Sequence, residues 1–217
     1  MTALPSLVNL RVLGWLLTAL LPLAARGASV PQQEYEAVLH SGPDIVHGEA
    51  LFSTCAACHG TNGAGVADGS VPAIAGQHFR VIVRQLVDFR HDKRWDLRME
   101  HFSDQHHLSG AQDIADVADY ISGMPSTRAS DHGSGEYLQH GGEVYVRLCA
   151  SCHGVAAEGD ERNPRLAGQH YEYLLRQMHD ALEGRRPNFP HGHVRLLQRF
   201  ELADLAGVAD YLSRLGD

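Results

Sequence analysis

The sequence predicts an all-α protein built from two similar lobes, and three observations lead to that prediction. Long segments of the first half recur in the second, for example VPAIAGQHFRVIVRQL at 71–86 and NPRLAGQHYEYLLRQM at 163–178. From Pro72 to Met99 the matching position lies 92 residues further on, a period that indicates two lobes rather than a solenoid. Apolar residues recur at helical spacing in both halves, and no segment shows the convincing alternation of period two that a half-buried strand requires.

The repeat also divides the chain into regions. We expect a first lobe over residues 30–126 and a second over residues 136–217, with a linker at 127–135 between them. The sequence of the join, PSTRASDHGSG, is short, polar and rich in Ser and Gly. A lobe of about 90 residues is small, and a buried cofactor would supply apolar core that its side chains alone do not.

The first residues are typical of a signal peptide. Arg11 precedes the apolar run VLGWLLTALLPLAA, which is short for a membrane span and is followed by small residues. We therefore expect residues 1–27 to be removed on export and the mature protein to be periplasmic. Membrane contact is expected only if this segment is retained as an anchor.

The charge balance restricts the class of partner. The formal net charge is −8, and loss of Arg11 and Arg26 with the signal peptide takes it to −10. An acidic protein of this kind is not expected to bind nucleic acid, and its negative charge favours docking to a basic protein surface.

The four cysteines all lie in two copies of one motif, CAACHG and CASCHG. C-x-x-C-H is the attachment motif of c-type haem: each thiol bonds one vinyl group, and the following histidine is the proximal iron ligand. The residues concerned are Cys55, Cys58 and His59 in the first copy and Cys149, Cys152 and His153 in the second. A redox-active cysteine pair and a zinc site are the alternatives, but zinc requires the two pairs to converge, and each pair lies in its own repeat. We therefore expect two covalently bound haem c groups.

Helices are expected around each motif. In the first lobe we expect one over 44–59 that ends at the attachment site, a second over 78–90, and a third that begins at Ser109. The spacing from Ser109 to Gln112 is that of a capping box. The second lobe repeats these helices over 142–153, 171–184 and 202–212.

Together these features resemble the dihaem class I cytochromes c, most closely the cytochrome c4 family of periplasmic electron carriers. The resemblance is carried by both haem motifs, by AGQH followed by Arg-Gln-Leu or Arg-Gln-Met, and by the closing helices SGAQDIADVADYI and ELADLAGVADYL. It implies two tandem class I cytochrome c lobes, each wrapped around a covalently attached haem, with the haem edges close together near the lobe interface.

The resemblance also implies that both AGQH segments lie near the haems. Gln77 and Gln169 are therefore expected in the environment of the haem propionates. For His78 and His170 we favour a structural role, contacting a propionate or the interface. Two arginines one turn into matched helices, Arg84 and Arg176, are further candidates for propionate contacts, and an exposed helix face is the alternative.

In this family the distal iron ligand is a methionine in the loop before the last helix, and this chain departs from that pattern. Lobe two has no methionine there, and the loop PNFPHGHVRLLQRF (187–200) offers His191 and His193 instead. The offset of 92 residues places His193 opposite His101 and His191 opposite Met99. We therefore expect His101 and His193 as the distal ligands.

Alternatives to these ligands remain open. Met99 would give the first haem histidine–methionine ligation, and His106 or His107 is also within reach of that site. In lobe two, His191 is the alternative to His193. A last possibility is that these histidines lie at the surface and leave a distal position open.

Two six-coordinate haems transfer electrons but offer no free iron position to a substrate. Imidazole in place of a thioether lowers the reduction potential. The main prediction is a periplasmic carrier without catalytic residues, which relays single electrons between a donor dehydrogenase or quinol oxidant and a downstream oxidase or reductase.

Two other functional classes remain. One is a dihaem oxidoreductase that acts on a small sulfur or nitrogen oxyanion. Resemblance to the dihaem thiosulfate dehydrogenases implies a cysteine ligand at the active haem, and this chain has no spare cysteine. Basic residues near the distal loops would nevertheless suit an anion: Arg94, Arg98, Arg185, Arg186 and Arg195. The other is a haem-based sensor in which His101 or His193 is displaced.

Overall fold

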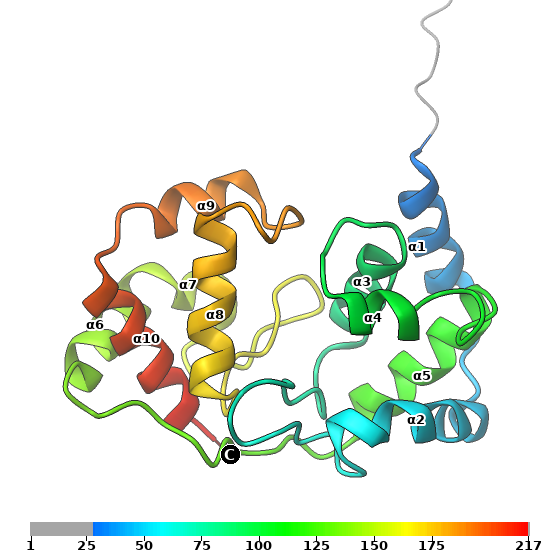
Figure 1. Ribbon diagram of the computed structural model, residues 1–217, viewed down its shortest axis with the longest axis horizontal. Helices are drawn as coiled ribbons and strands as arrows, with labels where there is room; N and C mark the ends of the chain where they lie inside the picture. Colours follow the sequence, from blue (N-terminus) through cyan, green and yellow to red (C-terminus); the bar gives the residue numbers. More distant parts are fainter. Residues whose placement is uncertain (1–27, 217) are drawn as a thin grey trace, which may run out of the picture.

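The computed structural model describes residues 28–216, which form ten α-helices and no β-strand (Figure 1). The prediction of an all-α protein is confirmed. The expected signal peptide, residues 1–27, lies outside the described residues. Among the helices that are described, none has the length and apolar character needed to cross a membrane.

The first lobe, on the right of Figure 1, contains five helices. They are α1 (Val30–His40), α2 (Ile45–His59), α3 (Phe79–Arg90), α4 (Leu97–Phe102) and α5 (Ala111–Gly123). Their apolar faces meet in one core, in which Val83, Ile114 and Ala118 are fully buried. Helix α1, which the sequence did not predict, packs on α3 and α5. Its Glu34 forms ion pairs with Arg90 and His91 at the end of α3.

The second lobe, on the left of Figure 1, repeats this arrangement without a counterpart of α1. Its helices are α6 (Leu138–Leu148), α7 (Ala150–His153), α8 (Tyr171–Leu182), α9 (His191–Leu197) and α10 (Leu202–Arg214). Tyr145, Val208 and Leu212 belong to its core, and a smaller cluster around Leu205 fills the space between α8 and α9. The two lobes therefore have separate cores.

Two local predictions need correction. The capping box at Ser109 is wrong: α5 begins after Gly110, and Gln112 instead donates to Gly42 O and Asp116 Oδ1. The helix expected over 142–153 is interrupted at Cys149, where α6 ends and the short α7 begins. The capping box that the structure does contain joins Glu201 and Asp204 at the start of α10.

In each lobe the helix that leads to the attachment motif crosses the closing helix at a glycine. A Cβ at Gly48 of α2 would lie 2.1 Å from Asp116 O of α5, and a Cβ at Gly141 of α6 would lie 2.0 Å from backbone atoms of Gly207 of α10. Real Cβ atoms do not approach backbone so closely, so only glycine permits this separation of the helix axes. The crossings fix the helices that lead to the attachment motifs against the helices that close each lobe.

We expect Gly48→Ala to lower the free energy of unfolding by about 1–3 kcal/mol, because the added methyl group must push α2 away from α5. Gly123→Ala is the matched control, since Gly123 is also helical and a Cβ there meets nothing within 4 Å. Thermal unfolding of both holoprotein variants, followed by circular dichroism, checks this. Equal stability of the two variants would contradict a tight crossing.

Candidate functional site

The four cysteines lie where α2 ends and where α6 gives way to α7. In each motif the first thiol, Cys55 or Cys149, is half-buried and the second, Cys58 or Cys152, is exposed. Burial raises the pKa of Cys55, and burial together with Cys152 raises the pKa of Cys149 to about 11. One thiol therefore faces the apolar interior and the other faces solvent. A group bonded to both would lie partly inside the lobe and partly at its surface.

The histidine of each motif is buried and oriented by one hydrogen bond. His59 is 7% exposed and donates from Nδ1 to Pro72 O at 3.0 Å; His153 is 8% exposed and donates to Pro164 O, also at 3.0 Å. Burial lowers the pKa of both imidazoles, although the bond to the carbonyl opposes this effect. Each neutral ring therefore keeps Nε2 free as an iron ligand, which is the usual arrangement of a metal-bound histidine. Two thiols and this imidazole form a donor set that fits haem c.

The AGQH glutamines reach across the joint between the lobes. Gln77 donates from Nε2 to Arg165 O at 3.0 Å and accepts from Arg165 N at 2.9 Å. Gln169 makes the same pair of bonds with Ala73, at 2.7 and 3.0 Å. Both ends of each carboxamide are thus used by one backbone residue of the other lobe. The structure places these glutamines in the joint between the lobes, and their expected place in the environment of the haem propionates stays a prediction.

This joint is connected directly to the buried histidines. Ala73 follows Pro72, whose carbonyl accepts from His59, and Arg165 follows Pro164, whose carbonyl accepts from His153. Each glutamine therefore holds the segment that orients the motif histidine of the other lobe. We call this pair of contacts the reciprocal clasp.

The neighbouring AGQH histidines extend the clasp. His78 Nε2 lies 2.8 Å from Glu158 O of lobe two, and His170 Nε2 lies 2.8 Å from Ala64 O of lobe one. His170 also pairs through Nδ1 with Asp131 of the segment that joins the lobes, at 2.6 Å. Of the two structural roles expected for these histidines, a propionate contact or an interface contact, their hydrogen bonds support the interface contact.

On the distal side of lobe two, His193 faces His153. The two ring centroids are 6.1 Å apart with the planes inclined by 51°. His193 is half-buried and packs against Phe189 at 5.0 Å, whereas His191, the first residue of α9, is exposed. Burial, together with His153 and Arg186, lowers the pKa of His193 and keeps its imidazole in the neutral form that ligates metals.

Lobe one differs on this side. His101 is 61% exposed, and its ring lies against His107 and Phe102 at centroid distances of 4.4 and 5.1 Å. The charged groups of α4 that influence the pKa of His59 are instead Asp96 and Arg98, on either side of the start of that helix. Charged groups at the start of α4, rather than at its end, are therefore the ones that act on His59.

The helix positions explain this difference. Met99 is the third residue of α4, and His193 is the third residue of α9, so the two helices are related by 94 residues rather than 92. Six residues separate α3 from α4, and eight separate α8 from α9. The offset measured over the AGQH segments therefore does not extend into the distal loops. Counted from the start of each helix, Met99 rather than His101 occupies the position in α4 that His193 occupies in α9.

A polar cluster lies between the lobes beside the distal loops. Arg94 donates to Gln85 Oε1, Tyr173 Oη and Gln177 Oε1 at 2.6, 2.7 and 2.9 Å. Arg186 donates to Gln85 and to Asn188, both at 3.3 Å. Burial and then the charge of Arg94 lower the pKa of Arg186 to about 9. The side chains that accept these bonds are all neutral, so two half-buried guanidinium groups lie close together, and Asp180 and Asp88 act on Arg186 electrostatically without a direct bond.

The carboxylates and the other arginines nearby are engaged elsewhere. Asp88 accepts from Asn188 at 2.8 Å, and burial raises the pKa of Asp88. Arg84 is exposed over the ring of Tyr35 at 5.4 Å, and Arg176 donates to Gly69 O of lobe one at 2.7 Å. These are the contacts of the two arginines expected at the propionates, and that role stays a prediction, whereas Arg94 and Arg186 form a half-buried cationic pair. The feature of the sequence that points to Arg94 and Arg186 is their matching position, a few residues after α3 and α8 and beside the distal loops.

Known proteins resemble this chain over both lobes. The cytochrome c family model matches residues 45–125 and 138–216. Cytochrome c4 of Pseudomonas aeruginosa is 31% identical, over 81% of this chain and 90% of that protein. The thiosulfate dehydrogenase electron acceptor of Stutzerimonas stutzeri is 30% identical, over 75% of this chain and 79% of that protein. The crystal structure of reduced cytochrome c4 from Pseudomonas stutzeri matches with a TM-score of 0.70 at 23% identity, over 81% of this chain and all of that one.

The reciprocal clasp predicts a crossed effect of substitution. We expect Gln169→Ala to shift the NMR signals of His59, and Gln77→Ala to shift those of His153, because each loses the two bonds that fix the opposite proximal carbonyl. Each variant should also lose about 1–3 kcal/mol of stability, since a backbone N–H and C=O are left without partners.

The measurement is the hyperfine-shifted proton spectrum of the oxidised holoprotein, in which the two haems are resolved separately. Gln139→Ala is the matched control, because this exposed glutamine bonds only within its own helix, to Glu143. Shifts confined to the lobe that carries the substitution would contradict a crossed arrangement.

Proposed function

The chain belongs to the cytochrome c4 family of dihaem class I cytochromes c, and on that premise we propose that it passes single electrons along two unlike haems. As a member of this family it is an electron-transfer protein with two covalent haem c groups. We call the group at Cys55 and Cys58 haem one and the group at Cys149 and Cys152 haem two. Each supplies a single iron that alternates between the ferrous and ferric states. The protein supplies the axial ligands, the propionate contacts and the docking of the lobes.

The spacing of His153 and His193 is the observation that carries the proposal. An iron atom between two imidazoles lies roughly 2 Å from each nitrogen and so roughly 3 Å from each ring centroid. Bis-histidine ligation therefore separates the centroids by roughly 6 Å. The distance of 6.1 Å in lobe two agrees with this value. His153 is the proximal and His193 the distal ligand of haem two.

For haem one we assign Met99 as the distal ligand and His59 as the proximal ligand. Register supports Met99, because it occupies the helix position in α4 that His193 occupies in α9. Environment supports it too, since Met99 is half-buried beside the end of α4 that faces His59, whereas His101 is exposed at the other end. Haem one then has histidine–methionine ligation and haem two has bis-histidine ligation.

Unlike ligands give the two haems unlike potentials. A thioether favours ferrous iron and raises the potential, whereas a second imidazole favours ferric iron and lowers it. Electron flow from haem two to haem one is therefore downhill. The donor docks at lobe two and the acceptor at lobe one. With both distal positions filled, neither iron binds a substrate, which favours a carrier over an enzyme or a ligand sensor.

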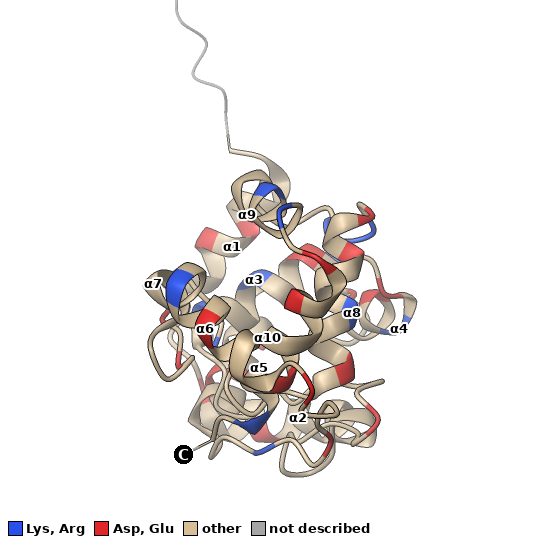
Figure 2. Cartoon of the chain, turned by 90° about the vertical axis from the view of Figure 1, so that its left-hand side faces the viewer, with Lys and Arg blue, Asp and Glu red and all other residues tan. Residues whose placement is uncertain are grey.

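The donor proposed is a dehydrogenase, and the setting is the periplasm. One relative of this chain is named as the electron acceptor of thiosulfate dehydrogenase, which supports a donor that oxidises a small sulfur compound. The face of lobe two drawn in Figure 2 carries acidic and basic residues on several helices rather than a single basic stripe. This surface suits transient docking to a protein rather than binding to nucleic acid.

Arg94 and Arg186 are proposed to hold haem propionates. Desolvated guanidinium groups with only neutral partners are costly unless an anion completes the cluster. The propionates are the anions that this cofactor brings, and the cluster lies between the lobes beside both distal loops. An arginine from each lobe would therefore contribute to one shared cationic site for the propionates.

The ligand assignment is tested by near-infrared magnetic circular dichroism of the oxidised protein. We expect one bis-histidine and one histidine–methionine signature of equal intensity. His193→Ala should convert only the first to a high-spin site that binds carbon monoxide when reduced, and Met99→Ala should convert only the second.

His191→Ala and His101→Ala are the controls, and neither should change the spectrum. Two bis-histidine signatures, with one lost in His101→Ala, would restore His101 as the ligand of haem one. A high-spin component in the unsubstituted protein would contradict two closed sites and favour an enzyme.

The propionate assignment predicts a change in the pH dependence of the potentials. Without Arg186 we expect the pKa of the contacting propionate to rise by roughly 1 to 3. In Arg186→Gln the pH range over which the reduction potential changes should therefore move to higher pH. At neutral pH the reduction potential should be lower than in the unsubstituted protein, because a positive charge near the iron is lost. Spectroelectrochemical titration between pH 5 and 8 measures this. Arg84→Gln, at an exposed arginine, should behave like the unsubstituted protein.

A further inference from the structure

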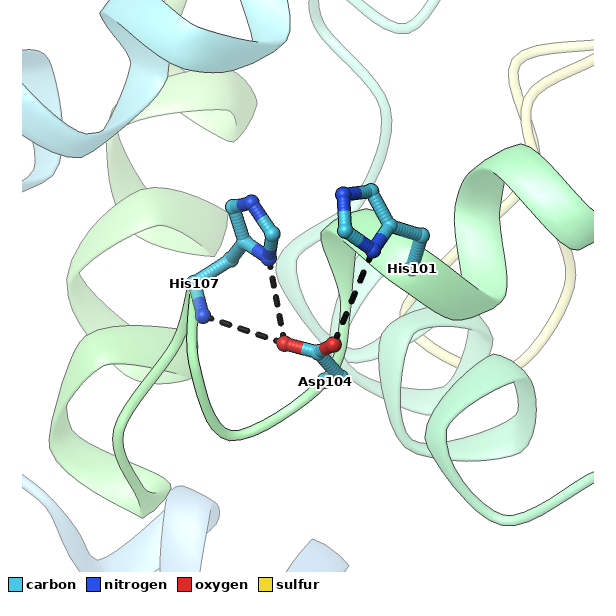
Figure 3. A group of neighbouring side chains, drawn as sticks. All are labelled: His101, Asp104 and His107. Carbon is cyan, nitrogen blue, oxygen red and sulfur yellow. Dashed lines mark hydrogen bonds and ion pairs between the residues drawn. The ribbon is translucent and has the colours of Figure 1, made fainter.

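A group of side chains whose ligand atoms lie close enough together to hold a metal ion is found at the end of α4 and in the loop that follows it (Figure 3). His101 is on the last turn of α4, and Asp104 and His107 are in the loop that follows. His107 Nδ1 lies 3.0 Å from Asp104 Oδ1, and His101 Nδ1 lies 3.8 Å from Asp104 Oδ2. One ligand atom from each residue lies within 4.8 Å of the other two. All three side chains are accessible to solvent.

These distances suit a small divalent transition-metal ion. Ligand atoms that bind such an ion at roughly 2.0–2.1 Å in tetrahedral geometry are roughly 3.4 Å apart. The two measured separations lie on either side of that value, so small side-chain adjustments complete the arrangement. Two imidazoles and one carboxylate are ligands that zinc, copper and nickel prefer, whereas magnesium and calcium prefer oxygen atoms alone.

The loop that carries these residues is held in place at both ends. Arg90, whose side chain is 4% exposed, donates from Nε to Ser103 O at 2.7 Å and from Nη2 to Leu108 O at 2.5 Å. Leu108 N also donates to Asp104 O at 2.9 Å. A buried arginine thus fixes the backbone immediately before Asp104 and immediately after His107. The site is built into the fold and does not depend on a loosely attached loop.

Lobe two has no equivalent of this site. Eight residues, 103–110, connect α4 to α5, whereas four residues, 198–201, connect α9 to α10. The longer connection in lobe one supplies both Asp104 and His107. We propose that His101, Asp104 and His107 bind one divalent ion of the zinc, copper or nickel class, with water completing its coordination.

The site would connect an external ion to haem one. Ser103, between His101 and Asp104, is fully buried and donates from Oγ to Met99 O at 2.6 Å. The ion would join the last turn of α4 to the loop before α5 and so brace the helix that carries Met99. This inference rests on the assignment of Met99 to haem one, because that assignment leaves His101 free for another ligand.

Isothermal titration of the oxidised holoprotein with Zn²⁺ tests the proposal. We expect one ion bound per chain and a loss of affinity of more than about tenfold in His107→Ala and in His101→Ala. Electron paramagnetic resonance with Cu²⁺ should show two nitrogen ligands, reduced to one in either variant. His106→Ala is the matched control, since His106 is exposed in the same loop but outside the cluster, and it should bind as the unsubstituted protein does.

The outcomes separate this site from the haem assignment. Absent Zn²⁺ binding, or binding that survives in His101→Ala and His107→Ala, overturns the metal site alone if the spectrum of haem one is unchanged. If His101→Ala instead converts haem one to a high-spin form, His101 is its distal ligand, and both the assignment of Met99 and the metal site are overturned.

Discussion

The reciprocal clasp is the constraint on which the rest of the structure depends. A carboxamide that bonds the N–H and C=O of one residue imitates a backbone pairing, and only Asn or Gln offers a donor and an acceptor side by side. In each lobe the residue that is clasped, Ala73 or Arg165, follows the proline whose carbonyl orients a proximal histidine. Docking of the lobes and orientation of the iron ligands therefore use the same backbone segments.

That shared use accounts for the pattern of likeness between the two lobes. The segments that form the clasp must match each other, because each supplies both a glutamine and the backbone that the opposite glutamine needs. The two halves of the chain resemble each other most clearly in these segments, residues 71–86 and 163–178. The distal loops lie outside the clasp and face no such requirement. Six residues connect α3 to α4, whereas eight connect α8 to α9. Eight residues connect α4 to α5, whereas four connect α9 to α10.

The same contrast between the clasp segments and the distal loops explains which features could be predicted from the sequence. The haem motifs, the six main helices and the relationship to a family could be predicted, because each depends on residues close together in the chain. The role of Gln77 and Gln169 could not, since their partners lie 88 and 96 residues away in another lobe. The equivalence of His101 and His193 rested on an offset of 92 residues, which α3 and α8 keep over their whole length, whereas the starts of α4 and α9 lie 94 residues apart. Arg94 and Arg186 were noticed as basic residues, but their shared neutral partners become evident only when the lobes are docked.

A symmetric joint with asymmetric distal sides is a useful arrangement for directed electron transfer. The proximal sides of both haems are constrained by the clasp, so changes there in one lobe would disturb the other. The distal ligand is the largest determinant of potential that can change without breaking that joint. With His193 as the proposed ligand of haem two and Met99 as that of haem one, the two potentials would differ while the bonds of the clasp stay the same in both lobes. Under the proposed ligation, a direction of electron flow would therefore originate in the distal loops, where the two lobes differ, while the clasp holds the two lobes together.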